Sequence, residues 1–501
     1  MKSWMKKVSL SLASLMSFSI LSTTVAGAIT ANDTTEYKTL PFDEVKIGVM
    51  SDIHISSAYI NKSEKSVWEY TMQKAKKAFD YYKKMQVSAI MITGDLVNYG
   101  TEAEYQALDG FLEEVYGSPE NAPELIFVMG NHEYVNRDNA TGTSLGIYET
   151  NAEVWQYHKQ YLDRWSSYEL YNGLAGGEAI GSPIARVDVE GVQIVSISPD
   201  ATNYTVTDEG IARLKTVMDE AQAEAEGKPI IAGFHFPTGT DFSGVQLLGY
   251  NSGAGHGHNK VNTLLQNYPS AVLFSGHTHR SVLSERAISQ DCGFTLVHAG
   301  AVHTPDNDKR VSGTSLTYDN LPGGYNVLEP SGLKEIDRTN RSCEGMLLTF
   351  GEDSMQIDRV DFLKGTLYEE VEPWIIPYEI TSENKTEKFD YVNTVRKEQQ
   401  DSDALTFAQG STVSVEEKWG VMKITFPSVQ QFRDVEGYKI VVSKTGEEDV
   451  VKYWLSNYAD YPTQAPTYSA FINEVRDIEG YSVKVYPMDF YGNLYSPITT
   501  L

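Results

Sequence analysis

Five short polar motifs, each following a β-like run, constrain the fold of this chain more than any other feature. From residue 45 to about 362, short runs rich in β-branched residues alternate with amphipathic helical segments, which is the pattern of an α/β fold. Loops that leave the carboxyl ends of strands converge at one edge of a sheet, so we expect the motifs to meet in one site. In chain order they are Ser51-Asp52-Ile53-His54, Gly94-Asp95, Gly130-Asn131-His132-Glu133, Gly233-Phe234-His235 and Gly276-His277-Thr278-His279.

The residue types in these motifs are those of a metal site. One such motif alone would be weak evidence, because a single His is usually structural and an Asp after a strand is often a helix cap. Carboxylate and imidazole ligands together suit Mn, Fe or Zn, and the absence of Cys from the motifs argues against a thiolate site. Asp95 carries two oxygens and can bridge two cations. Glycines before Asp95, Asn131 and His277 let the backbone turn sharply there.

In order and content, the motifs resemble those of the calcineurin-like metallophosphoesterase superfamily, whose pattern is Asp-x-His, Gly-Asp, Gly-Asn-His-(Glu/Asp), His and Gly-His-x-His. The resemblance covers residues 45–362 and implies a four-layer α/β/β/α sandwich with two central mixed sheets. It also implies a proton donor or charge stabiliser near the scissile ester, His132, which is not a ligand. The ligands it implies are Asp52, His54 and His279 for one metal, Asn131, His235 and His277 for the other, and Asp95 as the bridge.

The implied reaction is hydrolysis of a small phosphate ester. Two cations held close together activate a shared water, and the metal-bound hydroxide attacks phosphorus in line. The first three motifs are most similar to those of the class III cyclic nucleotide phosphodiesterases, so we predict a phosphodiesterase. A purple acid phosphatase is disfavoured because His54 is present and Asn98 occupies the position where those enzymes have a Tyr. Two alternatives stay open: a phosphomonoesterase or nucleotidase, and a surface-associated binding protein with a vestigial phosphoesterase domain.

Three residues outside the motifs' ligand set are candidate substrate contacts. His256 and His258 lie in a Gly-rich loop and could contact the phosphate or the leaving group, although a loop that only faces solvent explains them equally well. Arg280 follows the last ligand and could hold an anion, with a structural ion pair as the alternative. We expect His298 on a strand near the metal layer.

The chain divides into four segments. Residues 1–28 carry three lysines, an apolar run and the small residues Ala26-Gly27-Ala28, which predicts an export signal and a secreted or cell-surface protein, periplasmic where an outer membrane exists. The phosphoesterase domain is expected over residues 29–375, including a long loop over 302–340, and a polar linker over 376–403. Residues 404–501 have short alternating strands and no helical period, which predicts a β-sandwich of immunoglobulin or fibronectin type III character that binds the cell envelope.

The net charge restricts the class of binding partner, and the cysteine content bears on whether a disulfide forms. The net charge of −27 repels long polyanions, so we expect no long nucleic acid as a partner. A small phosphate ester, such as a nucleotide, stays compatible, because bound cations dominate the local field. No stretch beyond the signal is apolar enough to span a membrane.

The two cysteines, Cys292 and Cys343, favour one disulfide in an exported chain, with two buried thiols as the alternative.

Overall fold

The computed structural model describes most of the chain from Val45 onward. The described residues are 45–56, 65–137, 144–148, 151–170, 182–201, 204–238, 258–279, 281–303, 325–327, 329–331, 343–369, 371–401, 404–431, 435–456 and 467–500. The expected export signal, residues 1–28, lies outside them. Within these ranges, no helix combines the length and the apolar character needed to cross a membrane.

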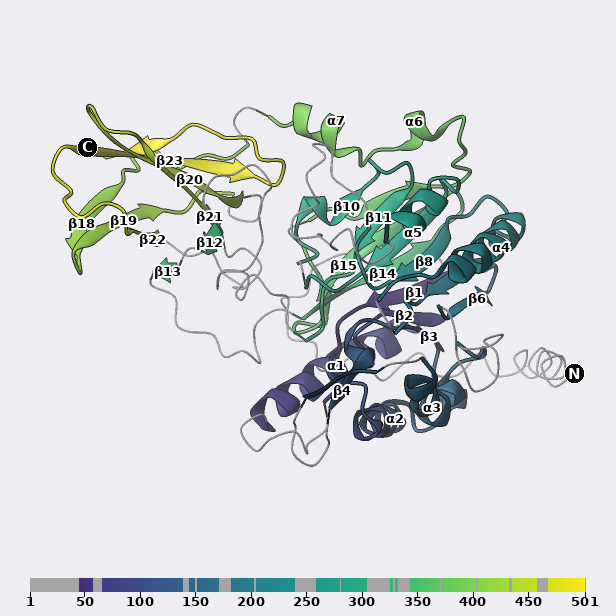
Figure 1. The fold of residues 1–501 in the computed structure, drawn as a ribbon. Helices are drawn as coiled ribbons and strands as arrows, with labels where there is room; N and C mark the ends of the chain where they lie inside the picture. The colour runs from purple at the N-terminus through teal and green to yellow at the C-terminus, as the bar shows by residue number, and fades with distance from the viewer. Residues whose placement is uncertain are drawn as a thin grey trace, which may run out of the picture. The chain divides into compact units, whose positions relative to one another are not determined.

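The first sheet has seven strands in the order β16-β15-β14-β1-β2-β3, with β17 paired to β15. The strands β1, β2 and β3 are parallel, and β14 runs antiparallel to β1, so the sheet is mixed. The helices α1 (Lys65–Met85) and α2 (Glu102–Tyr116) pack on it through a core that includes Phe79, Phe111 and Phe127 (Figure 1). The strand bounds are β1 Val45–Met50, β2 Ala89–Thr93, β3 Glu124–Val128, β14 Glu344–Phe350, β15 Ser354–Asp361, β16 Thr366–Leu367 and β17 Trp374–Pro377.

The second sheet has six strands in the order β10-β11-β9-β8-β7-β6. Its four middle strands are parallel, and the two edge strands are antiparallel to their neighbours. The helices α4 (Asp208–Glu224) and α5 (His258–Leu265) supply Leu214 and Val261 to the core on one face of this sheet. The strand bounds are β6 Ile184–Val189, β7 Val192–Ile197, β8 Ile230–Phe234, β9 Ala271–Ser275, β10 Ile288–Ser289 and β11 Thr295–His298.

A shared apolar cluster joins the two sheets. Val49 and Met91 come from the first sheet, and Ile194 and Val272 come from the second. Strands β2, β8 and β9 are buried along their whole length, which explains why their sequences read as continuous apolar runs. The part of the chain that forms these two sheets is therefore a mixed α/β fold.

Smaller elements connect these sheets and helices. Residues 376–403, expected as a linker, begin within β17 and contain two short helices, α6 and α7. Tyr391 in this segment is anchored to Gln290 by a backbone hydrogen bond of 2.9 Å. The remaining bounds are β4 Val135–Arg137, β5 Ser144–Ile147, α3 Asn151–Tyr161, α6 Lys385–Lys388, α7 Asn393–Glu398, and the 3-10 turns Pro119–Asn121, His132–Tyr134, Asp163–Trp165 and Glu285–Ala287.

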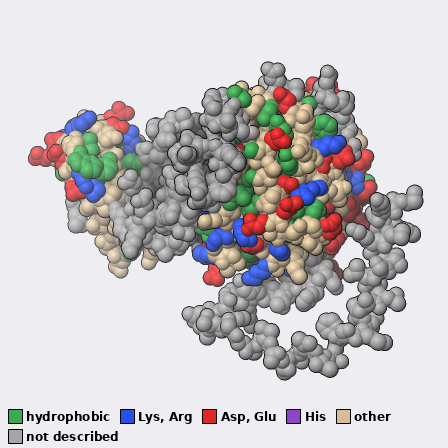
Figure 2. Space-filling model, turned by 90° about the horizontal axis from the view of Figure 1, so that it is seen from below, with side chains coloured by type: hydrophobic (Ala, Val, Ile, Leu, Met, Phe, Trp, Pro, Cys, Tyr) green, Lys and Arg blue, Asp and Glu red, His purple; other side chains and the backbone are tan. Residues whose placement is uncertain are grey.

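The carboxyl-terminal residues form two further sheets, of five and four strands, around a core that includes Ile424, Tyr438 and Val485. Two of the strands, β12 and β13, come from the segment 302–340 that the sequence predicts to be a loop of the first domain. On the face shown in Figure 2, Lys and Arg side chains are interspersed with Asp and Glu. The bounds are β12 Tyr325–Val327, β13 Glu329–Ser331, β18 Ser414–Lys418, β19 Val421–Pro427, β20 Val435–Lys444, β21 Val450–Leu455, β22 Thr467–Ile472, β23 Tyr481–Asp489 and β24 Ile498–Thr499.

The expected disulfide is wrong, because Cys292 and Cys343 are not bonded to each other. Cys343 is buried in the core that α1 and α2 form with the first sheet. Cys292 packs against the core that α4 and α5 form with the second sheet. Burial raises the pKa of the Cys343 thiol to about 12, so it stays protonated and unreactive at neutral pH.

Candidate metal centre

The loops that follow β1 and β2 run side by side beyond the ends of their strands. The backbone N–H of Asp52 donates to the carbonyl of Gly94 at 3.1 Å, and that of His54 donates to the carbonyl of Asp95 at 2.9 Å. The parallel pairing therefore continues past the strands and places the first two motifs in contact.

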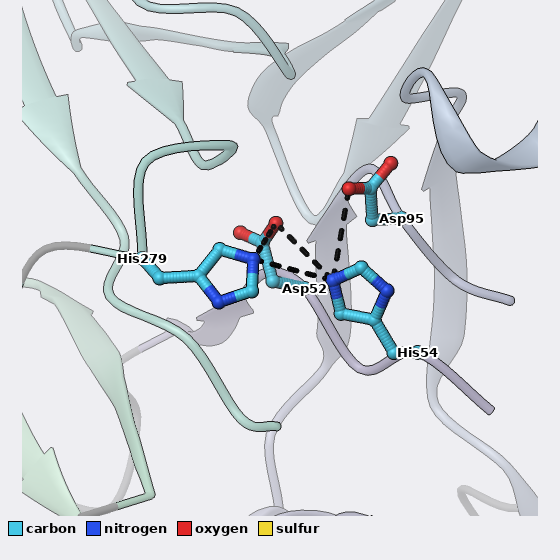
Figure 3. Close-up of side chains that lie close together, drawn as sticks. All are labelled: Asp52, His54, Asp95 and His279. Carbon is cyan, nitrogen blue, oxygen red and sulfur yellow. Dashed lines mark hydrogen bonds and ion pairs between the residues drawn. The ribbon is translucent and has the colours of Figure 1, made fainter. Parts of the chain in front are cut away.

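Asp52, His54, Asp95 and His279 form the first ligand group, and their polar atoms point toward one another (Figure 3). The Nε2 atom of His279 lies 3.1 Å from Oδ1 of Asp52 and 3.2 Å from Nε2 of His54. Nε2 of His54 lies 3.7 Å from Oδ2 of Asp95. Atoms bound to one transition-metal ion at about 2.0–2.2 Å are about 3 Å apart, so the group has the dimensions of a single-ion site.

Asn131, His235 and His277, again with Asp95, form the second group. Oδ1 of Asn131 lies 3.1 Å from Nε2 of His235 and 2.9 Å from Nδ1 of His277. Nε2 of His235 lies 3.3 Å from Oδ2 of Asp95. The same Asp95 oxygen therefore faces both groups, which is the position of a bridging ligand, while its Oδ1 accepts the backbone N–H of His132 at 3.0 Å.

The hydrogen bonds around His235 test whether the second group fits a cation. Its Nδ1 lies 2.9 Å from the carbonyl of Thr93, which can only accept, so Nδ1 carries the proton. In the neutral ring, Nε2 then presents a lone pair to the oxygens of Asp95 and Asn131. These three atoms, the nitrogen and the two oxygens, all carry lone pairs and repel one another unless a cation lies between them. The second group therefore fits a bound metal.

The pKa values of Asp95 and His235 also indicate that this group fits a cation. Burial opposes ionisation of Asp95, yet the imidazoles of His235 and His132 hold its pKa well below the usual range. Burial also opposes the cationic form of His235, but Asp95 and Asp52 raise its pKa to about 9. The metal-free site therefore attracts a proton to the position that a metal would take.

Five of the seven expected ligands have a left-handed backbone, with φ between 52° and 69°: Asp52, His54, Asp95, His277 and His279. This conformation costs about 1–3 kcal/mol for a residue other than Gly and persists only where the surroundings enforce it. The backbone N–H of His277, for example, donates to the Asp52 carboxylate at 3.0 Å. Six other non-Gly residues of the described chain also have positive φ, but only at the ligands do five such residues gather in one site.

The glycines of the motifs act in two ways. Gly94 has φ of 98°, as expected for a sharp turn. Gly130 and Gly276 are instead required by close approach, because a Cβ would lie 2.2 Å from Oδ1 of Asp95 at the first position and 1.8 Å from Oγ of Ser51 at the second. The expectation of sharp turns thus holds for Gly94, whereas the other two make room for ligand-bearing loops.

Glu133 has a positioning role that sequence reasoning missed. Its buried carboxylate accepts the backbone N–H groups of Asp95 at 3.2 Å, Val97 at 3.1 Å and Gly130. Burial and the nearby Asp95 charge raise its pKa. The only sequence signal was its place as the last residue of the third motif.

His132 lies at the edge of the site and is 31% exposed. Its Nδ1 donates to the carbonyl of Asn98 at 2.7 Å, which turns Nε2 toward the metal groups, 4.0 Å from Oδ2 of Asp95. The ring stands edge-on to His54 with 4.5 Å between centroids. His132 therefore presents Nε2 to the two ligand groups from the partly exposed edge of the site.

The three candidate substrate contacts are not placed by the structure. His256 and Arg280 lie outside the described residues, and His258 is the first residue of α5, with its side chain outside the described part.

Two adjacent groups of O and N ligands with one shared carboxylate, at the carboxyl ends of strands in a mixed α/β fold, define a candidate dinuclear metallohydrolase. Residues 45–281 match the calcineurin-like phosphoesterase family. The protein is a metallophosphoesterase, a hydrolase that acts on phosphate ester bonds.

The chain is also similar to solved structures at low identity. A dimetal phosphatase from Danio rerio is 12% identical, with 67% of this chain and 99% of that chain covered and a TM-score of 0.39. A predicted phosphoesterase from Streptococcus pneumoniae is 10% identical, with 66% and 98% covered and a TM-score of 0.25. Vacuolar protein sorting 29 from Cryptosporidium parvum is 11% identical, with 67% and 98% covered and a TM-score of 0.26. No curated protein matches the chain.

Proposed function

We propose that this protein is a secreted two-metal phosphodiesterase that hydrolyses a small phosphate ester. The observation that supports it most directly is the single Asp95 oxygen that faces two ligand groups, with His132 beside it. The ligands we assign are Asp52, His54 and His279 for one metal, Asn131, His235 and His277 for the other, and Asp95 for both.

A pair of Mn, Fe or Zn ions in these positions would supply an activated water and neutralise charge on the phosphate. The protein's own contribution is positional. The bond from Nδ1 of His132 to Asn98 orients the ring, so a protonated Nε2 can deliver its proton to the departing oxygen. Glu133 keeps the loops of Asp95 and Asn131 in register, and His235 is held in its metal-binding tautomer by Thr93.

The aromatic side chains next to the site favour an ester with a flat group, such as a nucleotide. The Phe236 ring lies 4.9 Å from that of His277 but is buried, so on this side it is the half-buried Tyr204, with 6.2 Å between its centroid and that of Phe236, that can meet a base. On the other side, Tyr99 lies 6.4 Å from His132. Aromatic faces of this kind stack on bases at about 1–3 kcal/mol per base.

For the whole chain, we propose export followed by attachment to the cell envelope. The lysines and apolar run of residues 1–28 support export. The division of the apolar core into a layer between the two sheets and a layer on each outer side supports the four-layer α/β/β/α sandwich. The two sheets around Tyr438 support a β-sandwich of fibronectin type III character at the carboxyl terminus.

A surface aromatic pair supports the attachment role of the carboxyl-terminal domain. Trp419 is 80% exposed at the turn between β18 and β19 and stacks on Phe471, with 5.4 Å between centroids and 16° between planes. We propose that this pair docks on a wall polysaccharide, since flat rings stack on sugar faces. Trp419→Ala should abolish retention on isolated cell walls, while Leu494→Ala, at another exposed apolar side chain of the domain, should not. Equal retention of the two variants would exclude this role.

The catalytic proposal is tested with purified protein supplied with Mn. We expect hydrolysis of bis-p-nitrophenyl phosphate to exceed that of p-nitrophenyl phosphate, and both to collapse in Asp95→Ala and His132→Ala. A panel of cyclic nucleotides, nucleoside monophosphates and glycerophosphodiesters then identifies the substrate class. A wild type that cleaves monoesters only would replace the diesterase with the phosphomonoesterase alternative, and no hydrolysis with any metal would favour the binding protein.

A further inference from the structure

His298 lies at the end of β11, beside the strand that leads into the last motif. Strand β11 is parallel to β9, and His298 pairs with Ser275, the residue before Gly276. Its side chain is only 1% exposed, so its ring nitrogens must find partners within the protein. A buried His that is not a ligand, placed this close to two ligands, needs a physical explanation.

The contacts of His298 assign its tautomer. The backbone N–H of Gly300 points at Nδ1 at 3.2 Å, and a backbone N–H can only donate, so Nδ1 carries a lone pair. The proton of the neutral ring is therefore on Nε2. That atom lies 3.0 Å from the carbonyl of Gly276 and 2.9 Å from Oγ1 of Thr278, and both can accept from it.

Gly276 and Thr278 flank His277, and His279 follows, so the bonds of His298 hold the loop that carries one ligand for each metal. His277 contacts Asn131 in the second group, and His279 contacts Asp52 in the first. Both ligands have left-handed backbones, with φ of 69° and 53°. The distance between the two metal positions thus depends on the strained loop Gly276–His279, which His298 holds through its bonds to Gly276 and Thr278.

We propose that His298, in its neutral Nε2–H form, is a positioning residue that sets the geometry of the Gly276–His279 loop and thereby the affinity and spacing of the two metals. The proposal rests on the proposed function, since it presumes that both ligand groups bind metal. Removal of a partner that orients metal ligands costs about 10–100-fold in metal affinity.

The test compares Mn binding by calorimetry in four proteins. His298→Ala should weaken binding of at least one Mn about 10–100-fold. His298→Gln, which keeps an N–H donor at the Nε2 position, should bind within about threefold of the wild type. His158→Ala is the matched control, because His158 is equally buried but lies in α3, where its ring packs against Tyr105 and Phe127, and the Mn affinity of this variant should be unchanged.

Two further measurements do not depend on activity. In the two-Mn protein, the electron paramagnetic resonance signal of the coupled pair should change in His298→Ala and be retained in His298→Gln and His158→Ala. The second measurement is an NMR spectrum of the metal-free protein labelled with ¹⁵N-His. The ring signals of His298 are identified as those that disappear in His298→Gln, and their chemical shifts should be those of a neutral ring protonated on Nε2. A ring protonated on Nδ1 would overturn the proposal, even where the alanine variant does not fold.

The outcomes separate this inference from the proposed function. A wild type that binds no pair of Mn ions would overturn both. A wild type that binds two ions, with His298→Ala equal to it in affinity and in spectrum, would overturn the role of His298 alone.

Discussion

Nε2 of His235 lies 3.3 Å from Oδ2 of Asp95, and in the neutral ring both atoms present lone pairs. This contact is stable only with a cation between the two atoms or with a proton on His235. Metal binding should therefore stabilise the fold. Free Mn at about 100 times its Kd should add about 3 kcal/mol to the free energy of unfolding. Urea denaturation with Mn and with a chelator measures it, and Asp95→Asn should make the two curves coincide.

His132→Ala should lower kcat without loss of metal, because His132 is not in either ligand group. General acid catalysis contributes about 10²–10⁴-fold, and more for a poor leaving group. We expect a loss of that size with alkyl phosphodiesters and a much smaller one with p-nitrophenyl esters, whose leaving group needs little protonation. Steady-state kinetics on both ester types, with metal content as the control, checks this. An equal loss on both would mean that His132 does not act as the acid.

Gly130→Ala should disable the site because the added Cβ would lie 2.2 Å from Oδ1 of Asp95. We expect weaker metal binding and a drop in kcat of more than about tenfold, since a displacement of about 1 Å can cost about 100-fold. Gly110→Ala is the matched control. Gly110 is an exposed residue of α2 with nothing within 4 Å of the added Cβ, so the change should stabilise the protein by about 1 kcal/mol. Similar kinetics for the two variants would contradict the close-approach argument.

Glu344 should make stability depend on pH. Its buried carboxyl accepts bonds from Ser281, Val282 and Tyr368, and burial raises its pKa from 4.5 to about 7. Between these values the folded protein holds a proton that the unfolded chain releases, so the contribution is fully present below pH 4.5 and is lost as the pH rises to about 7. Its size is at most about 3 kcal/mol.

Glu344→Gln isolates this contribution, since Gln does not titrate. The free energy of unfolding of the wild type, relative to Glu344→Gln, should fall as the pH rises from 4.5 to 7 and then level off. A difference that is constant over this range would show that the carboxylate is already ionised in the folded protein.

Much of the site could be predicted because its residues follow β-like runs directly. Asp52, His235 and His277 each stand within two residues of a buried strand, so the strand pattern alone places them at one edge of the sheets. The positioning roles of Glu133 and His298 could not be predicted, because they depend on the approach of separate loops. Local pattern also could not reveal that β12 pairs with β21, more than a hundred residues later, or that the cysteines lie in different cores.

In the proposed function, one carboxylate, that of Asp95, joins two metals into a single catalytic unit. This role is tested most directly by titrating Mn into metal-free protein while metal content and hydrolysis of bis-p-nitrophenyl phosphate are measured on the same samples. We expect two ions per chain and activity that rises with the second ion, and Asp95→Asn should abolish that rise. Full activity with one ion bound, or two ions bound in a protein that hydrolyses no phosphate ester, would contradict it.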